Sequence, residues 1–581
     1  MNNHRSRRLR AVPVLLSLGL VAAACSSSSS TTTTASGASA TTSAAGTTIA
    51  GSAATTTAGT SGGATTAAGT AASGTTAGTT ASTNAPATNA PATDADTKKR
   101  LTMVGTNGPQ AMDPATSVVT CEAEQLRWVY DTLIRLKPDG TFAPGLAQSW
   151  ESPDPSTFTL HLRKGVKFQD GTDFNATAVK DELVRAQTVK TSTQVGSLSA
   201  ITSIDTPDDF TVTLHLKSPR AGILPSIFTG IAGMIPSPKA VAAAGDTYGA
   251  NGAVGAGPWA FDKLTPTADL HVTTWDGYWD SADRYLAGID MLGGASEFQT
   301  KRIESGELQY ATMKDVQLPE AQAGKNAGDV DFKLTPTTQY AEIYINWTKA
   351  PFDNVLVRQA LEYSLDRDLL AKSLTQGSAT ASSQPMPTNS WAYDKSLEGM
   401  YPYDPAKAKA LLAQAGFPNG ITVDVGAINY PYYTTLSQAV QDMVKDSGFT
   451  FNLVTVAPAD INNRLYKLKD LPVAITAYSG NSDPGVTLEA KFSSTGNSNP
   501  AGTTVDGIDA LLAKGAASVD QATRATSYQQ VEDLVMKNAL SIPVFHNGGL
   551  VAFTPKLKGV VKGYTTCQMG DFVSTPVYFQ K

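Results

Sequence analysis

Two glycine-rich stretches of the sequence have the residue types and spacing of known chemical motifs. Residues 59–63 read Gly-Thr-Ser-Gly-Gly, which fits the turn that exposes a nucleophilic serine between a strand and a helix. Residues 255–260 fit the glycine fingerprint of a dinucleotide-binding turn, which must open a helix. The first stretch lies in a run of Ser, Thr, Ala and Gly that predicts neither element, and Pro258 and Trp259 indicate the start of a strand. Neither stretch therefore predicts chemistry.

Histidine and cysteine spacing argues against a metal site or a catalytic centre. Five histidines are scattered along the chain without a zinc pattern, and the three cysteines include no close pair. His161 and His215 stand on alternating segments, where we expect them to face solvent. The sequence predicts no catalytic residue, no metal and no cofactor. A pair of carboxylates leaves no local pattern, so a secreted hydrolase stays open as an alternative.

The N-terminus has the parts of a secretory leader. Residues 5–10 supply four arginines, and residues 11–24 form an apolar run that is too short to span a bilayer. This run ends in Ala-Ala-Ala before Cys25, which resembles a bacterial lipobox, so we expect Cys25 to carry a lipid on the outer face of the membrane. A cleaved leader with an incidental cysteine is the alternative. Arg7 and Arg8 leave twin-arginine and general export both open.

A long polar segment separates the leader from the folded part, which begins near Lys98. Residues 26–97 are almost wholly Ser, Thr, Ala and Gly with some Pro and Asn, and bury too little apolar surface to fold. As a flexible coil, this tether would hold its ends about 40–50 Å apart. The formal net charge of −6 becomes more negative once the arginine-rich leader is removed, which disfavours nucleic acid as a partner.

Two cysteines remain beyond the leader, one near each end of the folded part. Cys121 and Cys567 would meet an oxidising compartment after export. A disulfide that ties the two ends together is one hypothesis, and two separately buried thiols are the alternative.

Strands and helices both appear in the folded part. Residues 158–163 and 210–216 alternate apolar and polar side chains, which predicts half-buried strands. Asp404 and Pro405 predict the start of a helix that ends at Gly416. The mixture indicates an α/β protein.

A second helix is predicted after Asp353. Leu361, Leu365 and Leu369 recur every four residues, so we expect them to share its apolar side.

Several stretches, in order along the chain, resemble motifs of the bacterial family 5 extracellular solute-binding proteins, which serve ABC importers of oligopeptides, dipeptides and nickel. The most specific is residues 162–171, Leu-Arg-Lys-Gly-Val-Lys-Phe-Gln-Asp-Gly, which is similar to the family's LRxGVKFxDG. Residues 144–151 resemble PGLAxSWE, and residues 351–361 resemble PFDDVRVRQAL. Further matching stretches stand at residues 129–140, 255–259, 403–408 and 542–545.

The resemblance implies an α/β fold of two lobes that close as a clamp, of the class II periplasmic-binding-protein type, with an extra subdomain in lobe I. The chain would cross between the lobes near Asn346 and Phe545, which suits a hinge. The implied division is a leader at 1–25, a tether at 26–97, lobe I at 98–145, 258–345 and 546–581, the extra subdomain at 146–257, and lobe II at 346–545.

The resemblance also implies a ligand site between the lobes, lined by aromatic rings, amides and a charge. Core packing is the alternative for the aromatic residues, and helix capping is the alternative for the acid. The ligand-binding candidates are Thr106, Asn107, Tyr340, Tyr344, Trp347, Tyr478, Asn481 and Asp483.

One position departs from the family pattern. Peptide binders of the family place an Asp where this sequence has Gly480, and that Asp pairs with the α-amine of the ligand. Either Asp483 binds the amine, or the ligand is not a free-amine peptide. Tyr430, Tyr432 and Tyr433 form a further cluster that lines the site or lies in a surface loop.

The function implied is that of a monomeric, lipid-anchored binding protein outside the cytoplasm. It would capture a peptide or another small solute and deliver it to the permease of an ABC importer. The same fold with a sugar or a nickel chelate as ligand is an alternative. The tethered hydrolase and a structural or signalling lipoprotein with an empty cleft are alternatives of other classes.

Overall fold

The computed structural model describes most of the chain beyond the tether. Cys25, Cys121 and Cys567 lie outside the described residues, so the lipid attachment and the disulfide stay predictions. Within the described part, no helix is both long enough and apolar enough to cross a bilayer. The described residues are 94–581 except 106–107, 118–121, 139, 295–297, 562–571 and 574.

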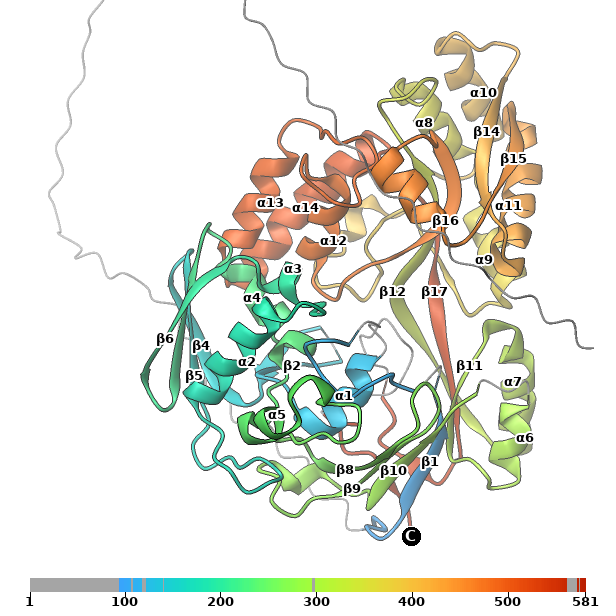
Figure 1. Ribbon diagram of the computed structural model, residues 1–581. Helices are drawn as coiled ribbons and strands as arrows, with labels where there is room; N and C mark the ends of the chain where they lie inside the picture. The colour runs from blue at the N-terminus through green and yellow to red at the C-terminus, as the bar shows by residue number, and fades with distance from the viewer. Residues whose placement is uncertain are drawn as a thin grey trace, which may run out of the picture. The chain divides into compact units, whose positions relative to one another are not determined.

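One mixed sheet of eleven strands runs through the described chain (Figure 1). Two long strands at its centre, β12 (Asp331–Ile345) and β17 (Ile542–Phe553), pair antiparallel. Beyond β17 lie β11 (Tyr310–Met313), β1 (Arg100–Val104), β10 (Gly288–Leu292), β9 (Leu270–Thr274) and β8 (Trp259–Leu264). Beyond β12 lie β16 (Val473–Ser479), β14 (Ile421–Ile428) and β15 (Phe449–Val456), and the short β13 (Thr380–Ala381) pairs with β17.

The pairing of β12 with β17 is interrupted near its middle. Residues 331–336 pair with residues 548–553, whereas Tyr340 pairs with His546, so three residues of β12 stand opposite Asn547 alone. We call residues 337–339 together with Asn547 the junction. It divides the sheet into a first half that contains β1 and β8–β11, and a second half that contains β14–β16.

Each half has its own apolar core. In the first half, Trp128 on α1 (Glu122–Tyr130) packs near Tyr310 and Met291, and α6 (Gln299–Glu304) and α7 (Leu318–Ala327) cover the other face of the sheet. In the second half, Val440, Phe492 and Val535 belong to one large cluster. The helices that supply it include α11 (Pro431–Val444), α12 (Pro484–Phe492), α13 (Ile508–Ala517) and α14 (Gln521–Lys537).

A separate four-stranded sheet forms a subdomain of the first half. Its order is β4 (Ala147–Asp154), β5 (Thr157–Leu162), β7 (Thr211–Leu216) and β6 (Ile201–Asp208), and α2 (Ala176–Thr188) packs on its apolar face. We call it the small-sheet subdomain. The strands predicted at 158–163 and 210–216 are confirmed. His161 and His215 lie on the opposite face, partly exposed, beside Glu151 and Asp205.

The short elements complete the described chain. Two small two-stranded sheets pair β2 (Ile134–Leu136) with β3 (Phe142–Pro144) and β18 (Leu557–Lys558) with β19 (Tyr578–Phe579). The other α-helices between residues 189 and 257 are α3 (Val195–Leu198), α4 (Leu224–Ile227) and α5 (Pro238–Ala244), and α5 packs against the core of the first half.

The helix predicted after Asp404 is confirmed as α10 (Pro405–Gln414). The Asp404 carboxylate accepts a hydrogen bond of 2.9 Å from the backbone N–H of Lys407, which satisfies a donor that the first turn leaves free. The chain then passes Gly416 at a φ of +96°, a left-handed conformation that favours glycine after a helix.

The single helix predicted after Asp353 is wrong, because two helices occupy this segment: α8 (Val355–Tyr363) and α9 (Arg367–Thr375). Asp366 accepts a 3.0 Å hydrogen bond from the N–H of Leu369 and so starts a new helix in a new direction. Leu365 is therefore buried between the helices, and Leu369 is 55% exposed.

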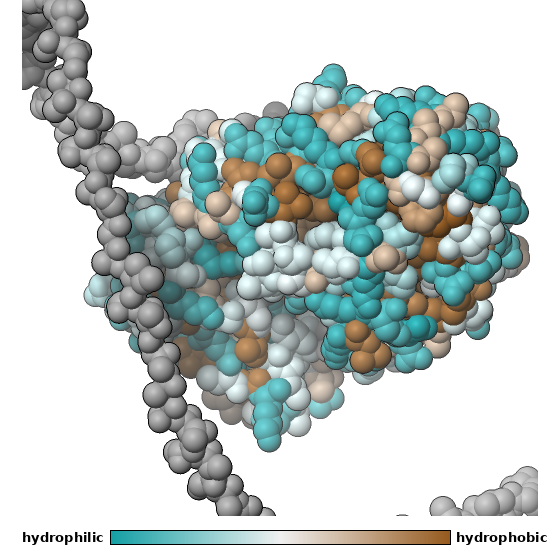
Figure 2. Space-filling view, turned by 90° about the horizontal axis from the view of Figure 1, so that it is seen from above, coloured by the Kyte–Doolittle hydropathy of each residue, from teal (hydrophilic) through white to brown (hydrophobic). Residues whose placement is uncertain are grey.

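The mixed α/β character predicted from the sequence is confirmed. Figure 2 shows one face of the molecule, on which apolar residues form small groups among hydrophilic ones. Small exposed apolar groups are ordinary on a protein surface and do not by themselves indicate a functional site.

Candidate functional site

Polar side chains of the junction and of the second half form a chain of hydrogen bonds where the two halves of the sheet meet. Asn547 donates a 2.6 Å hydrogen bond from Nδ2 to Oε1 of Gln339, and Gln339 donates from Nε2 to the Ser479 hydroxyl at 3.1 Å. Tyr432 donates to Oδ1 of Asn547 at 3.4 Å, and Thr337 donates to the Asn547 carbonyl at 2.8 Å. Amides and hydroxyls offer both donors and acceptors, so this chain of side chains could bind a polar solute.

A carboxylate lies beside this chain of hydrogen bonds. Asp315 begins the short 3-10 helix η5 (Asp315–Gln317) directly after β11, and its neighbours are the hydroxyl of Ser378 and the side chain of Tyr432. Burial raises the pKa of Asp315, and the Ser378 hydroxyl offsets only part of that rise. Burial, and secondarily the charge of Asp315, raises the pKa of Tyr432.

Glycine is required where β17 passes Ser378. A Cβ atom at Gly548 would lie 2.0 Å from the Ser378 carbonyl oxygen, which is far closer than atoms can approach. The close contact fixes Ser378 against the strand next to Asn547. The local sequence therefore holds Ser378, and with it the surroundings of Asp315, at the junction.

Three aromatic rings lie immediately next to the junction in the second half. Tyr340 on β12 pairs across the sheet with Tyr478 on β16 and with His546 on β17. Its ring centroid is 5.9 Å from that of Tyr478 and 5.2 Å from that of His546. Burial lowers the pKa of His546 to about 4, so its ring is neutral, and Nε2 contacts the Gln384 carbonyl at 2.9 Å.

A buried ion pair packs against these rings. Lys491 on α12 donates to both carboxylate oxygens of Glu342 at 2.7 and 2.6 Å, and Ser541 donates to the same carboxylate at 2.9 Å. The Lys491 nitrogen lies 4.4 Å from the ring centroid of Tyr478 and 5.1 Å from that of Tyr340. Burial lowers the pKa of Lys491. Because each charge is compensated, this pair connects α12 to β12 and leaves no free charge for a ligand.

Tyr344 and Trp347 line a cavity of only about 10 Å³ beside that ion pair. Both are buried, and the Tyr344 hydroxyl donates to the Leu465 carbonyl at 2.6 Å. A space of this size holds at most about one water molecule. Of the predicted aromatic residues, the structure therefore brings Tyr340 and Tyr478 together near the junction and packs Tyr344 and Trp347 in the interior. Their role as ligand contacts stays a prediction.

Asp483 is fully buried at the start of α12. Its carboxylate accepts a 2.8 Å hydrogen bond from the N–H of Gly485 and forms an ion pair of 2.7 Å with the buried Arg524. The helix-capping alternative thus describes its contacts. Asn481, two residues earlier, is exposed, and its side chain accepts from the N–H of Asp483 at 3.0 Å.

Gly480 lies too close to β12 for a side chain. A Cβ atom there would stand 2.9 Å from the carbonyl oxygen of Thr338, and the N–H of Gly480 donates to that same oxygen at 3.0 Å. The carboxylate that the family pattern places at this position has no room in this chain. Thr106 and Asn107, the remaining candidates, lie outside the described residues.

The junction residues with the clearest polar chemistry were missed in the sequence. Gln339 and Asn547 stand 208 positions apart, and no local pattern announces their contact. Tyr432 belonged to a noted tyrosine cluster, and its ring contacts Tyr433 at 5.2 Å. Asp315 carries no signal beyond its place after a strand.

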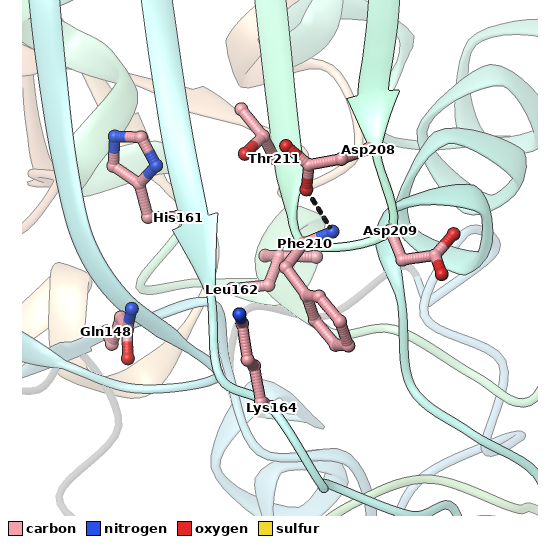
Figure 3. A pocket seen from close by; sticks show the side chains of 8 residues that line it. All are labelled: Gln148, His161, Leu162, Lys164, Asp208, Asp209, Phe210 and Thr211. Carbon is pink, nitrogen blue, oxygen red and sulfur yellow. Dashed lines mark hydrogen bonds between the residues drawn. The ribbon is translucent and has the colours of Figure 1, made fainter.

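An open hollow of about 380 Å³ lies elsewhere, on the small-sheet subdomain (Figure 3). Its charged groups Lys164, Asp208 and Asp209 are exposed. The Asp208 carboxylate already accepts a hydrogen bond of 2.8 Å from the N–H of Phe210 in the adjacent turn. A ligand bound on such an open surface would stay mostly in contact with water, so the junction is the better candidate. The lining residues are Gln148, His161, Leu162, Lys164, Asp208, Asp209, Phe210 and Thr211. Within the described residues, no group of His, Cys, Asp and Glu could hold a metal ion.

The small-sheet subdomain also touches the second half directly. Arg220 and Glu489 on α12 form a two-pronged ion pair, with Nη2 and Oε2 at 2.7 Å. Gly222 lies so close that a Cβ atom there would be 1.9 Å from the carbonyl oxygen of Ser518. Val519 packs against the apolar core of the subdomain. The two halves are therefore joined at the junction and meet again at this second contact.

Known proteins with sequences similar to this chain are binding proteins. Heme-binding protein A of Haemophilus influenzae is 31% identical over 471 residues, which cover 75% of this chain and 84% of that protein. Glutathione-binding protein GsiB of Pectobacterium atrosepticum is 29% identical and covers 71% of this chain and 81% of its own.

Solved structures share the fold. HbpA2 of Haemophilus parasuis is 24% identical with a TM-score of 0.74, and the match covers 83% of this chain and all of that one. The periplasmic binding protein DppA of Helicobacter pylori, solved with the peptide STSA, is 22% identical with a TM-score of 0.66, over 83% of this chain and 98% of its own. The predicted two-lobed fold is thereby confirmed, while its division into exact residue ranges stays a prediction.

The profile of the bacterial extracellular solute-binding proteins, family 5 middle region, matches residues 141–499. That span covers more than half of the chain and includes most of the motifs on which the resemblance rested. Together with the fold, it assigns the chain: this protein belongs to the family 5 bacterial extracellular solute-binding proteins.

Proposed function

We propose that this protein captures a peptide or a similar small solute at the junction and delivers it to the permease of an ABC importer. The observation that carries this proposal is the hydrogen-bonded chain of Tyr432, Asn547, Gln339 and Ser479, which joins polar groups of the junction to those of the second half at the point where the two halves meet. All four side chains are partly or fully exposed. They are therefore accessible to a solute and able to exchange their present partners for it.

Capture would work by closure around the junction. Each half has a separate core, and the two strands that join the halves lose regular pairing at residues 337–339. Such a break absorbs a change of backbone angle more easily than a continuous ladder does, which is what a hinge requires. A solute that contacts both halves binds the closed arrangement better, and its binding shifts the population by that difference in affinity.

Whether the solute is a free-amine peptide depends on whether an acid is available to bind its α-amine. Gly480 has no room for a carboxylate, and Asp483 is already paired with Arg524, so neither residue offers a free acid to an α-amine. This observation favours a second candidate, in which the same fold binds a non-peptide solute such as a sugar or a nickel chelate, or a peptide whose amine is held elsewhere.

The location proposed is the outer face of the cell membrane. Cys25 would carry the lipid, and residues 26–97 would form a tether long enough to let a monomer reach both the solute and the permease.

The test is a melting-temperature screen of the full chain against glutathione, tetra-alanine, hemin, a nickel–histidine chelate and glucose. A bound compound at 100 times its Kd adds about 2.7 kcal/mol to stability, which shifts the melting temperature measurably. We expect a shift with at least one compound, no chemical turnover of it, and a smaller shift for Asn547→Ala. Turnover would identify the tethered hydrolase, and no shift with any compound would contradict the proposal.

A further inference from the structure

Asp315 is a partly buried acid that has no Lys, Arg or His as a partner within the described part of the chain. Its neighbour is the Ser378 hydroxyl, which offsets only part of the rise in its pKa that burial causes. Other acids near the junction differ in this respect: Glu342 is bound by Lys491, and Asp483 is bound by Arg524. An uncompensated carboxylate that is partly removed from water lowers the stability of the fold, and such groups are often found at functional sites.

The surroundings of Asp315 come from both halves of the sheet. Asp315 itself follows β11 in the first half, whereas Ser378 and Tyr432 belong to the second half. β11 pairs with β17 up to Met313 opposite Leu550, a register that carries the following residues toward Gly548 and Asn547. The charge of Asp315 acts on Tyr432, which donates to Asn547, so Asp315 lies near one end of the polar chain of the junction. A group bound to Asp315 would touch residues of both halves at once.

Large apolar side chains are exposed on the two segments that hold Asp315 and Tyr432. Val316, the residue after Asp315, is 67% exposed, and Tyr430, two residues before Tyr432, is 57% exposed. An exposed apolar residue next to a carboxylate suits an organic cation, because the charge is paired while part of the carbon skeleton is covered.

We propose that Asp315 is the acid with which this protein recognises a positively charged nitrogen group, an amine or a guanidinium, of its solute. This inference rests on the proposed function and deepens it, since it supplies the anchor that Gly480 does not provide. A charged solute nitrogen would replace water at the carboxylate and form a charge-assisted hydrogen bond there. The cost of burying the acid would then be offset only in the loaded protein.

The experiment compares two matched pairs of probes: tetra-alanine with N-acetyl-tetra-alanine, and glutathione with N-acetylglutathione. The full chain, Asp315→Asn and the control Asp329→Asn are each titrated by calorimetry. Asp329 is an exposed acid of the first half, so its variant makes the same chemical change away from the junction. We expect the unaltered protein to bind the free-amine member of a pair at least tenfold more tightly than the acetylated one.

Asp315→Asn should lose about tenfold or more in affinity for the free amine and almost nothing for the acetylated probe, whereas Asp329→Asn should match the unaltered protein. Without ligand, the melting temperature of Asp315→Asn should be no lower than that of the unaltered protein, because the variant removes an uncompensated charge. If the acid had only a structural role, the melting temperature of the variant would fall. If Asp315→Asn keeps the full preference for the amine, the inference fails and the proposed function stands. If the unaltered protein binds neither member of either pair, the proposed class of solute fails as well.

Discussion

Individual charges in the second half of the sheet differ in how they are compensated. Glu342 is paired with Lys491, and Asp483 is paired with Arg524, so each of these buried acids has a positive partner. Glu532 on α14 is also fully buried, but its carboxylate accepts hydrogen bonds from backbone N–H groups, with that of Met386 at 3.1 Å from Oε1. Burial raises the pKa of Glu532 to about 8, so this side chain is largely protonated at neutral pH.

This difference predicts how stability changes with pH. Because the folded pKa of Glu532 lies above the unfolded value of 4.5, its contribution to stability is full below pH 4.5 and is lost as the pH rises through 8. Glu532→Gln abolishes that loss. The melting temperature of the variant relative to the unaltered protein should therefore rise between pH 5 and 8, by the equivalent of a few kcal/mol, and level off above. A difference that stays constant from pH 5 to 9 would show that Glu532 is ionised in the fold.

At the scale of single elements, the contact of β17 with Ser378 is the most restrictive feature of the junction. Gly548→Ala would place a Cβ atom 2.0 Å from a backbone oxygen, and backbone must move to relieve it. We expect a loss of about 1–3 kcal/mol in unfolding free energy, together with weaker binding of whichever screened solute shifts the melting temperature, since Asn547 is the adjacent residue. Gly252→Ala is the matched control, because nothing lies within 4 Å of a Cβ atom there. Denaturant titration of both variants gives the comparison, and equal stabilities would contradict the expected crowding.

Local elements were predictable from sequence where the cause is local. The cap at Asp404 and the alternation in β5 and β7 follow from side chains within a few residues, and both appear as expected. The division into α8 and α9 was missed because Asp366 competes with the regular spacing of leucines around it. The polar site was missed for a different reason: the contact of Asn547 with Gln339 depends on the register of two strands 208 residues apart, which no local rule supplies.

At the scale of the whole described molecule, the two halves are held by the junction and by the second contact, at which Arg220 pairs with Glu489. The second contact lies on the small-sheet subdomain, outside the shared main sheet. In the proposed clamp it would therefore act on the balance between open and closed arrangements without contacting the solute. The side chains are about 30% exposed, so the pair is partly screened by water and its contribution is modest.

Reversing one charge tests this separation of roles. Arg220→Glu places two carboxylates together and should enlarge the distance between labels introduced at the exposed Lys217 and Lys514, as measured by fluorescence energy transfer without ligand. Affinity for the screened solute should fall about three- to tenfold, because less of the protein is in the arrangement that binds, although no contact with the solute has changed. Adding Glu489→Arg recreates the pair with its charges exchanged and should restore both the distance and the affinity. If Arg220→Glu equals the unaltered protein in both measurements, the second contact does not control closure. If the double variant stays open, the shape of the contact around Gly222, and not its charge, holds the two halves together.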